Sequence, residues 1–141
     1  MVIVDANVLL YAVDRASAHH ERSRSWLDTS LAGSEAVGLA WMALLAFVRI
    51  GTNAAVLPNP MTADQATSQI ETWLAAPAAV TADPTPRHAS LLRGLLREAG
   101  TAGNLTTDAH LAALALEYGA EIVSFDRDFA RFPGVRHRLP G

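Results

Sequence analysis

Four aspartates stand beside segments whose residues favour regular structure. Asp5 follows the apolar segment "VIV" (2–4), and Asp126 and Asp128 follow "AEIVSF" (120–125). Asp108 occupies the first turn of an apolar segment, 107–118, that has the length of a helix. In an open parallel sheet, ligands bind beyond the carboxyl ends of the strands. We therefore expect these carboxylates, which come from three separate segments, to converge on one edge of a sheet.

A group of carboxylates in one place indicates a divalent metal site. Carboxylates a few ångströms apart raise one another's pKa, and burial raises it further, whereas a bound cation reverses both effects. Mg²⁺ and Mn²⁺ prefer oxygen ligands, and such a metal can polarise a phosphoryl oxygen and generate hydroxide near neutral pH. The chain has no cysteine, which excludes thiolate metal sites and disulfides. The pattern is compatible with metal-dependent hydrolysis of a phosphodiester.

Each acid also has a simpler structural interpretation. In this interpretation Asp5 and Asn7 do no more than cap a helix that begins at Val8. Asp108 does no more than complement a helix dipole. Asp126 and the aspartate two residues later can be turn and capping residues. Capping alone, however, does not require that all the acids occur at the ends of strands, so the four together favour a site.

Neighbouring polar residues leave further alternatives open. Thr106, Thr107 and Ser124 are either caps or hydroxyl groups that orient the carboxylates. His110 lies two residues after Asp108 and so points away from it on a helix. Glu117 falls on the opposite helical face and is predicted to lie outside the site. The histidines are expected to be solvated or packed rather than ligands.

Alternating apolar and polar segments predict the elements that position these acids. We expect strands at 2–5, 36–40, 78–82, 120–125 and 135–139, the last at an edge of the sheet. Helices are expected at 8–13, 17–31, 42–52, 62–75, 86–99 and 107–118, with a short helical turn at 126–132. Strands that alternate with helices imply an α/β fold, with a mostly parallel sheet covered on both faces.

Length and composition are those of one compact domain. The chain has 141 residues, of which 50% are hydrophobic, and we expect a single domain over residues 1–141. The longest apolar run, 36–48, is shorter than the ~18 residues that suggest a membrane span, and Gly38 interrupts it. The N-terminus lacks the pattern of a signal peptide. These features predict a soluble, intracellular protein.

The basic residues are all arginines. The chain has eleven of them and no lysine, which excludes P-loop nucleotide binding and Schiff-base chemistry. The formal net charge of −3 does not suggest a nucleic-acid partner, because phosphate neutralisation normally leaves a basic footprint. Arg127, Arg131, Arg136 and Arg138, with His137, nevertheless crowd the last fifteen residues. That segment either meets a phosphate backbone locally or forms a solvated edge.

Three segments together resemble a known family. They are "VIVDANVLLYA" at the start, "LLAFVRIGTN" (44–53), and "NLTTDAHLAALALEYGAEIVSFDRDFARF" (104–132). This ordered combination resembles the PIN-domain ribonucleases, and in particular the VapC toxins of bacterial VapBC toxin–antitoxin pairs. The likeness covers essentially the whole chain.

The resemblance implies a fold and a catalytic site. The fold is a PIN-like three-layer α/β arrangement, with a small, mostly parallel, twisted sheet between helices. Asp5, Asp108 and Asp126 match the metal-binding and catalytic carboxylates, and Asp128 is a further candidate ligand. The expected cofactor is Mg²⁺, for which Mn²⁺ can substitute.

The resemblance also implies supporting residues and partners. Asn7 and Thr107 match positions that steady the metal ligands, and Ser124 is a third supporting candidate. Candidate RNA-binding residues are Arg49, Arg127 and Arg131. Members of the family cleave structured RNA such as tRNA or ribosomal RNA, commonly dimerise, and are inhibited by a cognate VapB antitoxin. A cytoplasmic location follows, with no association with membranes.

One departure from the family pattern bears on activity. The family usually supplies a glutamate from the helix after the second strand, near Ala46, but this chain has no acidic residue between Val37 and Ala63. Glu35 precedes the second strand and is expected at the wrong end of it. Two hypotheses follow: an active metal-dependent toxin, or a weakly active or inactive module that binds RNA or antitoxin. Phosphotransfer at Asp5 is disfavoured, because the families that use it resemble one another in needing a lysine.

Overall fold

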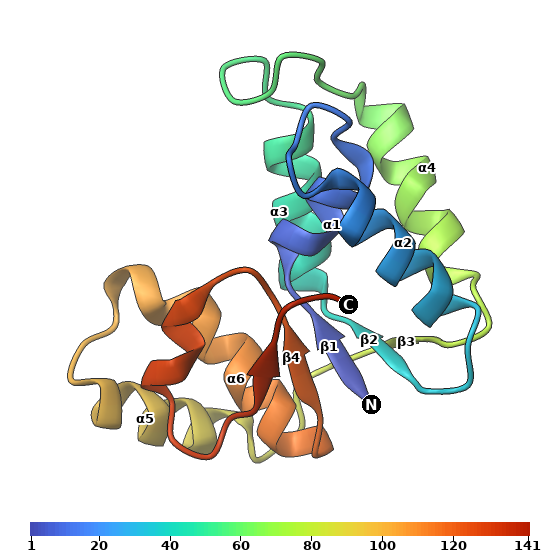
Figure 1. Cartoon of the computed structure of the whole chain (residues 1–141). Helices are drawn as coiled ribbons and strands as arrows, with labels where there is room; N and C mark the ends of the chain where they lie inside the picture. Colours follow the sequence, from blue (N-terminus) through green and yellow to red (C-terminus); the bar gives the residue numbers. More distant parts are fainter.

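The computed structural model describes residues 1–141 and contains a five-stranded sheet in the order β3-β2-β1-β4-β5 (Figure 1). Every neighbouring pair of strands is parallel. The strands are short: β1 (Val2–Val4), β2 (Val37–Leu39), β3 (Ala79–Thr81), β4 (Glu121–Val123) and β5 (His137–Arg138). The predicted parallel α/β sheet is confirmed, with β5 at an edge.

Six α-helices and two short 3-10 helices connect the strands. They are α1 (Ala6–Val13), α2 (His20–Leu31), α3 (Trp41–Gly51), α4 (Ala63–Leu74), α5 (His88–Ala99), η1 (Gly103–Leu105), α6 (Thr106–Tyr118) and η2 (Arg127–Arg131). In Figure 1, α1 to α4 gather above the sheet and α5 and α6 lie at its lower left. None of these helices has the length and apolar character needed to cross a membrane.

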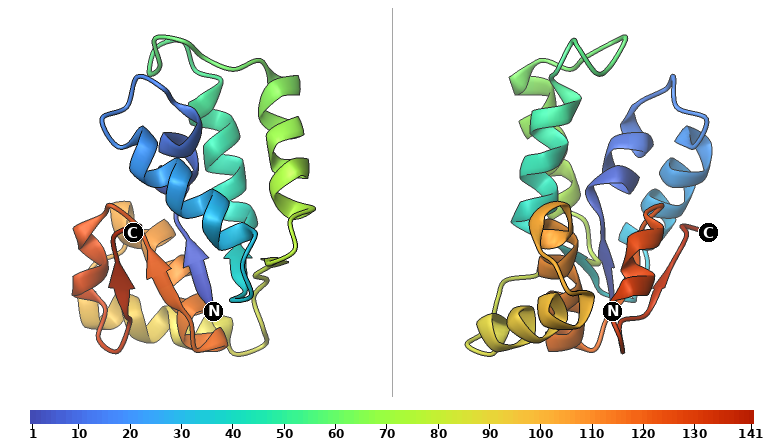
Figure 2. Two further views of the ribbon diagram at one scale, coloured as in Figure 1. Left: turned by 45° about the vertical axis from the view of Figure 1, so that its right-hand side comes forward. Right: turned by 90° about the vertical axis from the view of Figure 1, so that its left-hand side faces the viewer.

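The sheet separates two hydrophobic cores, because successive side chains of a strand point to opposite faces. Val2 and Val4 of β1 pack with α1, α2, α3 and α4 in a cluster of 19 buried residues. Ile3, between them, packs with α5, α6 and η2 in a cluster of 15 buried residues. The edge-on view in Figure 2 shows the helices on both sides of the strands. This is the three-layer arrangement that the resemblance implied.

The register of the central strands sets the level of the polar residues. Val4 pairs with Val123 of β4, and Ile3 pairs with Gly38 of β2. Asp5 therefore stands one residue beyond β1, beside Ser124, which is one residue beyond β4. The N-terminus of α1 begins at this same edge. The predicted convergence of strand ends is thus a consequence of parallel register.

The helix starts correct two details of the sequence prediction. α1 begins at Ala6 rather than Val8, and its N-cap is Asp5 rather than Asn7. α2 begins at His20 rather than Ser17, because side chains bond the backbone locally in the preceding turn: Asp14 accepts from the N–H of Ala16 at 3.0 Å. α4 begins at Ala63 because Thr62 is its N-cap, as part of a capping box with Gln65.

Candidate metal centre

Asp5 is held in place by hydrogen bonds to both carboxylate oxygens. Its Oδ1 accepts from the backbone N–H of Ala6 at 2.7 Å, which caps α1. Its Oδ2 accepts from the hydroxyl of Ser124 at 2.6 Å and from the side-chain amide of Asn7 at 3.2 Å. Only 9% of this residue is exposed. Because each carboxylate oxygen has two lone pairs, these bonds orient Asp5 and still leave acceptor capacity.

Ser124 and Asn7 join the ends of β1 and β4. The amide of Asn7 also donates to the hydroxyl oxygen of Ser124 at 3.1 Å, and its Oδ1 accepts from the N–H of Phe125 at 3.2 Å. The same hydroxyl accepts from the N–H of Asp126 at 2.9 Å. Ser124, at the centre of these bonds, is 2% exposed, whereas Asn7 is half-buried. Asn7 and Ser124 therefore both hydrogen-bond Asp5, which is the geometry that a supporting role would require.

Three further carboxylates lie within reach of one ion. Asp108 in the first turn of α6, Asp126 at the N-cap of η2, and Asp128 in its first turn each offer an oxygen, and these oxygens lie within 4.8 Å of one another. The N–H of Asp128 donates to Asp126 Oδ1 at 2.8 Å, which fixes the turn between them. Asp128, a secondary candidate in the sequence, thus stands in the tightest group of acids.

The pKa values of two acids in the site are raised, because their negative charges are not compensated. Burial, followed by the charges of Asp126 and Asp5, raises the pKa of Asp108 from the ordinary 3.8 to about 7. Burial is also the main cause of the raised pKa of Asp5, although the bonds from Ser124 and Ala6 oppose it. None of the four acids forms an ion pair with an arginine or histidine. No basic side chain therefore compensates the repulsion between Asp5 and Asp108.

The donor set fits a hard divalent cation. All the candidate ligands are carboxylate oxygens, they come from rigid element ends, and they repel one another unless a proton or a cation is bound. Neither sulfur nor imidazole is among them. Mg²⁺ and Mn²⁺ are the ions that such an all-oxygen, partly open site suits.

Other predicted residues lie at the margin of this cluster. Thr107 is exposed at the start of α6 and donates no side-chain hydrogen bond, so the support expected from its hydroxyl is not seen. Arg127 and Arg131 are exposed on η2, and Arg49 is exposed in the last turn of α3. Ala46 is half-buried on α3, a helix that contains no acidic residue.

Two glutamates lie outside the site, as predicted. Glu35 pairs with the amino group of Met1 at 3.6 Å, at the amino ends of the strands and so opposite the acids. Glu117 turns to the other side of α6, where its carboxylate accepts from the N–H of Thr85 at 2.8 Å and contacts His88 Nδ1 at 2.7 Å. Burial raises the pKa of Glu117, but the hydrogen bonds from Thr85 and His88 outweigh it and the net pKa is lowered. His110 contacts His88 at 2.9 Å and points away from Asp108.

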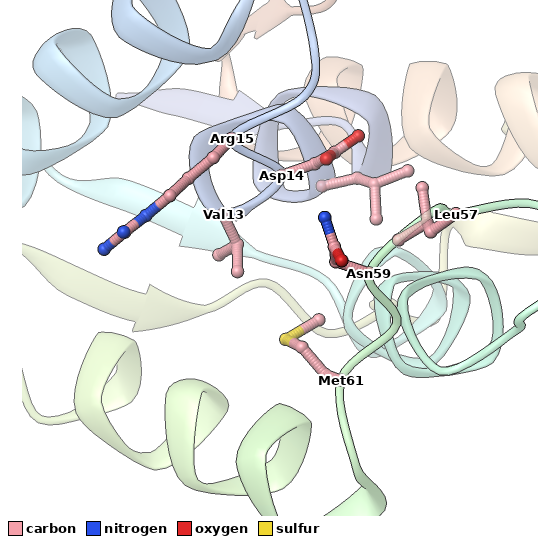
Figure 3. A pocket seen from close by; sticks show the side chains of 7 residues that line it. Val13, Asp14, Arg15, Leu57, Asn59 and Met61 are labelled. Atoms are coloured by element: carbon pink, nitrogen blue, oxygen red, sulfur yellow. The ribbon is translucent and has the colours of Figure 1, made fainter.

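A cavity with both apolar and charged lining residues lies at the far end of α1 (Figure 3). Its volume is about 300 Å³, and Val13, Leu57 and Met61 line it together with Asn59. Asp5 and the C-cap Asp14 lie at opposite ends of α1, which puts this cavity roughly 12 Å along the helix from the acids. It holds none of the four clustered aspartates and is separate from the metal centre.

Comparison with known sequences agrees with the geometry. The PIN domain family matches residues 2–135. Ribonuclease VapC37 of Mycobacterium tuberculosis is 54% identical over 140 residues, which cover 99% of this chain and 97% of that protein. Ribonuclease VapC33 of the same species is 42% identical over 99% of this chain and 98% of that protein.

Solved structures show the same fold at low sequence identity. The crystal structure of VapBC2 from Rickettsia felis, bound to a DNA fragment from its promoter, matches with a TM-score of 0.71 at 19% identity, covering 99% of this chain and 98% of that chain. VapC20 of Mycobacterium tuberculosis, described as a sarcin-ricin loop cleaving toxin, matches with a TM-score of 0.67 at 16% identity, covering 96% and 99%. The chain belongs to the PIN domain family and, within it, to the VapC ribonucleases, the toxins of VapBC toxin–antitoxin pairs.

Proposed function

We propose that this protein is a divalent-metal-dependent endoribonuclease that hydrolyses phosphodiester bonds of RNA. The observation that carries the proposal is the cluster of Asp108, Asp126 and Asp128, with Asp5 beside it, which has no protein cation to neutralise it. A metal ion bound there would supply Lewis-acid polarisation of the phosphate and a reactive hydroxide. The chemistry of the donor set and membership of the VapC ribonucleases support the same conclusion.

The residues of the site take distinct roles in this proposal. Asp5, Asp108 and Asp126 hold the metal, and Asp128 supplies the oxygen that the absent helical glutamate would otherwise give. Ser124 fixes the orientation of Asp5 through its hydroxyl. Without a cation, Asp108 holds a proton near neutral pH, and this lowers the repulsion among the acids.

We extend the proposal to substrate and partners. Ribosomal RNA or tRNA is the proposed substrate, and the description of VapC20 as a sarcin-ricin loop cleaving toxin supports a structured RNA. A cognate VapB antitoxin is proposed as inhibitor, supported by the VapBC complexes that share the fold. The exposed apolar residues of α3, Trp41, Met42 and Leu45, support a homodimer, and acting on cellular RNA places the protein in the cytoplasm.

The test is cleavage of RNA by the purified chain freed of antitoxin. We expect cleavage with Mg²⁺ or Mn²⁺, loss of cleavage with EDTA, and recovery when the metal is restored. Asp5→Ala should abolish cleavage, whereas Asp83→Ala, which removes an exposed carboxylate outside the cluster, should not. Cleavage by Asp5→Ala at the wild-type rate would refute the proposal.

A further inference from the structure

A second cavity adjoins the metal centre on the side of β5. Its volume is about 460 Å³, within the range of small-ligand sites. Ser124 and Asp126 line it, so the cavity shares one acid with the cluster and also contacts the serine that bonds Asp5. The opposite walls come from the start of α2 and from the C-terminal strand, segments more than a hundred residues apart in sequence. A polymer held at the metal centre can therefore continue directly into this space.

The cavity is basic, although the whole chain has a formal net charge of −3. Arg22, Arg127 and Arg138 line it with two histidines, and Asp126 is the one acid among its lining residues. Glu121 accepts a hydrogen bond from Arg138 at 3.1 Å, which partly neutralises that arginine. Arg22 and Arg127 pair with no carboxylate. Two arginines with free charge thus face a cavity next to the metal centre.

Arg22 is positioned by the backbone. Its Nε donates to the carbonyl oxygen of Pro140 at 2.6 Å, while its terminal guanidinium nitrogens make no hydrogen bond within the protein. In Figure 1 the C-terminal end of the chain lies close to α1 and α2, consistent with this contact. A guanidinium fixed at Nε with its other donors free is suited to bind a phosphate oxygen.

Aromatic rings form part of the same cavity. His19 and Phe125 line it, and their ring centroids lie 4.4 Å apart at an interplanar angle of 31°. Tyr11 packs against both rings at 5.3 Å and supports them from behind. Rings beside a track of positive charge are what single-stranded nucleic acids use for stacking of bases.

We propose that this basic cavity binds the nucleotide adjoining the scissile phosphate of the RNA. Arg22 and Arg127 contact its backbone phosphates, and the exposed ring of His19 stacks on its base. The inference rests on the proposed nuclease function and deepens it, because it assigns the path of the substrate as it leaves the metal centre. Arg49 and Arg131 do not line the cavity, so Arg127 of η2 and Arg22 of α2 are the arginines that contact the substrate there.

The experiment measures binding separately from cleavage. The anisotropy of a short fluorescein-labelled single-stranded RNA is titrated with full-length protein in EDTA at pH 8, over a series of salt concentrations. For Arg22→Ala/Arg127→Ala we expect weaker binding and a log–log salt slope that is shallower by about 1.4, the value for two lost phosphate contacts on a single strand. His19→Ala should weaken binding about five-fold and leave the slope unchanged.

A matched variant removes the same charge elsewhere. Arg93→Ala/Arg97→Ala deletes two exposed arginines of α5, which lie outside the cavity, and should keep the wild-type slope. Equal slopes for the two double variants would overturn the inference. Arg127→Ala alone should make the slope shallower by about 0.7. Because this variant keeps the Arg22 contact with Pro140, its effect cannot come from loss of that contact.

The outcomes separate this inference from the nuclease proposal. If wild type cleaves RNA and the cavity variants bind like the controls, the inference fails and the nuclease remains. If RNA binds through the cavity but the wild type with Mn²⁺ never cleaves it, the nuclease proposal fails and the binding site remains. If the cavity variants bind RNA normally but lose affinity for an acidic antitoxin segment, the cavity is a protein-binding site and the inference is wrong.

Discussion

At the scale of single residues, the capping of α1 by Asp5 does not exclude the metal-binding role proposed for it. One of its oxygens caps α1 and the other accepts from Ser124 and Asn7. A carboxylate can do both because each oxygen has two lone pairs. The sequence could predict that Asp5 lies at a strand end. It could not choose the cap, because Asn7 and Asp5 are both good capping residues and the choice depends on the first turn starting at Ala6.

The raised pKa of Asp108 predicts an unusual pH dependence. Its carboxyl titrates near 7 in the folded chain and near 3.8 when unfolded, so the folded state binds more protons between these values. The contribution of Asp108 to stability therefore falls as pH rises from about 4 to about 7. In EDTA, Asp108→Asn should remove much of this fall and be more stable than wild type at pH 7.5, as measured by urea unfolding at pH 5 and pH 7.5.

The control for this prediction is Asp83→Asn, an exposed acid that lies outside the cluster. It should keep the wild-type difference between the two pH values. A pH dependence in Asp108→Asn that equals that of Asp83→Asn would show that the cluster does not store the repulsion inferred from its geometry.

At the scale of elements, α6 carries two polar groups with unrelated tasks. Asp108 on its first turn faces the acids, whereas Glu117 near its end fixes the segment before α5 through Thr85 and His88. Helical spacing predicted this division, since the two residues fall on opposite faces. The bonding partners of Glu117 could not be predicted, because Thr85 lies 32 residues away and only tertiary packing brings it near.

Glu117→Ala should therefore destabilise the fold more than it impairs the site. The Glu117 side chain is 0% exposed, and its removal leaves the half-buried N–H of Thr85 and the His88 ring without an acceptor. Hydrogen bonds to charged groups contribute ~2 kcal/mol, so we expect a loss of about that size in the free energy of unfolding. The measurement is urea unfolding, compared with Glu98→Ala, which removes an exposed glutamate of α5.

Equal stability of Glu117→Ala and Glu98→Ala would contradict this role.

The residues of the cavity beside β5 were also only partly predictable from the sequence. The segment containing Arg127 and Arg138 was a candidate for meeting phosphate, but His19 and Arg22 belong to a segment, 17–31, for which only a helix was expected. No local pattern marks them, because only tertiary packing brings the turn before α2 beside the segment after β4.

At the scale of the whole molecule, the candidate metal centre lies where two cores meet. Asp5 belongs to a helix of the 19-residue cluster, and Asp108 belongs to a helix of the 15-residue cluster. The sheet between the cores has strands of two or three residues. The alternation of strands with helices predicted a sheet covered on both faces, and the parallel order of the strands brings the acids to one end of it. The spacing of the acids is thus set by how both cores pack on three-residue strands.

Metal binding should consequently stabilise the entire domain. An ion that binds only the folded chain adds about 2.7 kcal/mol at a hundred times its dissociation constant, a rise in Tm on the order of 10 °C for a chain of this size. We expect MgCl₂ or MnCl₂ to raise Tm in wild type, measured by differential scanning fluorimetry, and to raise it far less in Asp108→Asn. An equal rise with NaCl at matched ionic strength would indicate general screening instead.

The placement of the acids across the seam between the cores has a consequence for how potency can change over time. Partial loosening of either core would separate Asp5 from Asp108 long before the chain unfolds, so catalysis would be the first property lost. Substitutions deep in either core, remote from any carboxylate, could then attenuate the protein without altering its active-site sequence. Successive substitutions of apolar core residues could in this way reduce the activity of a harmful enzyme gradually. Reversion of one such residue could restore that activity.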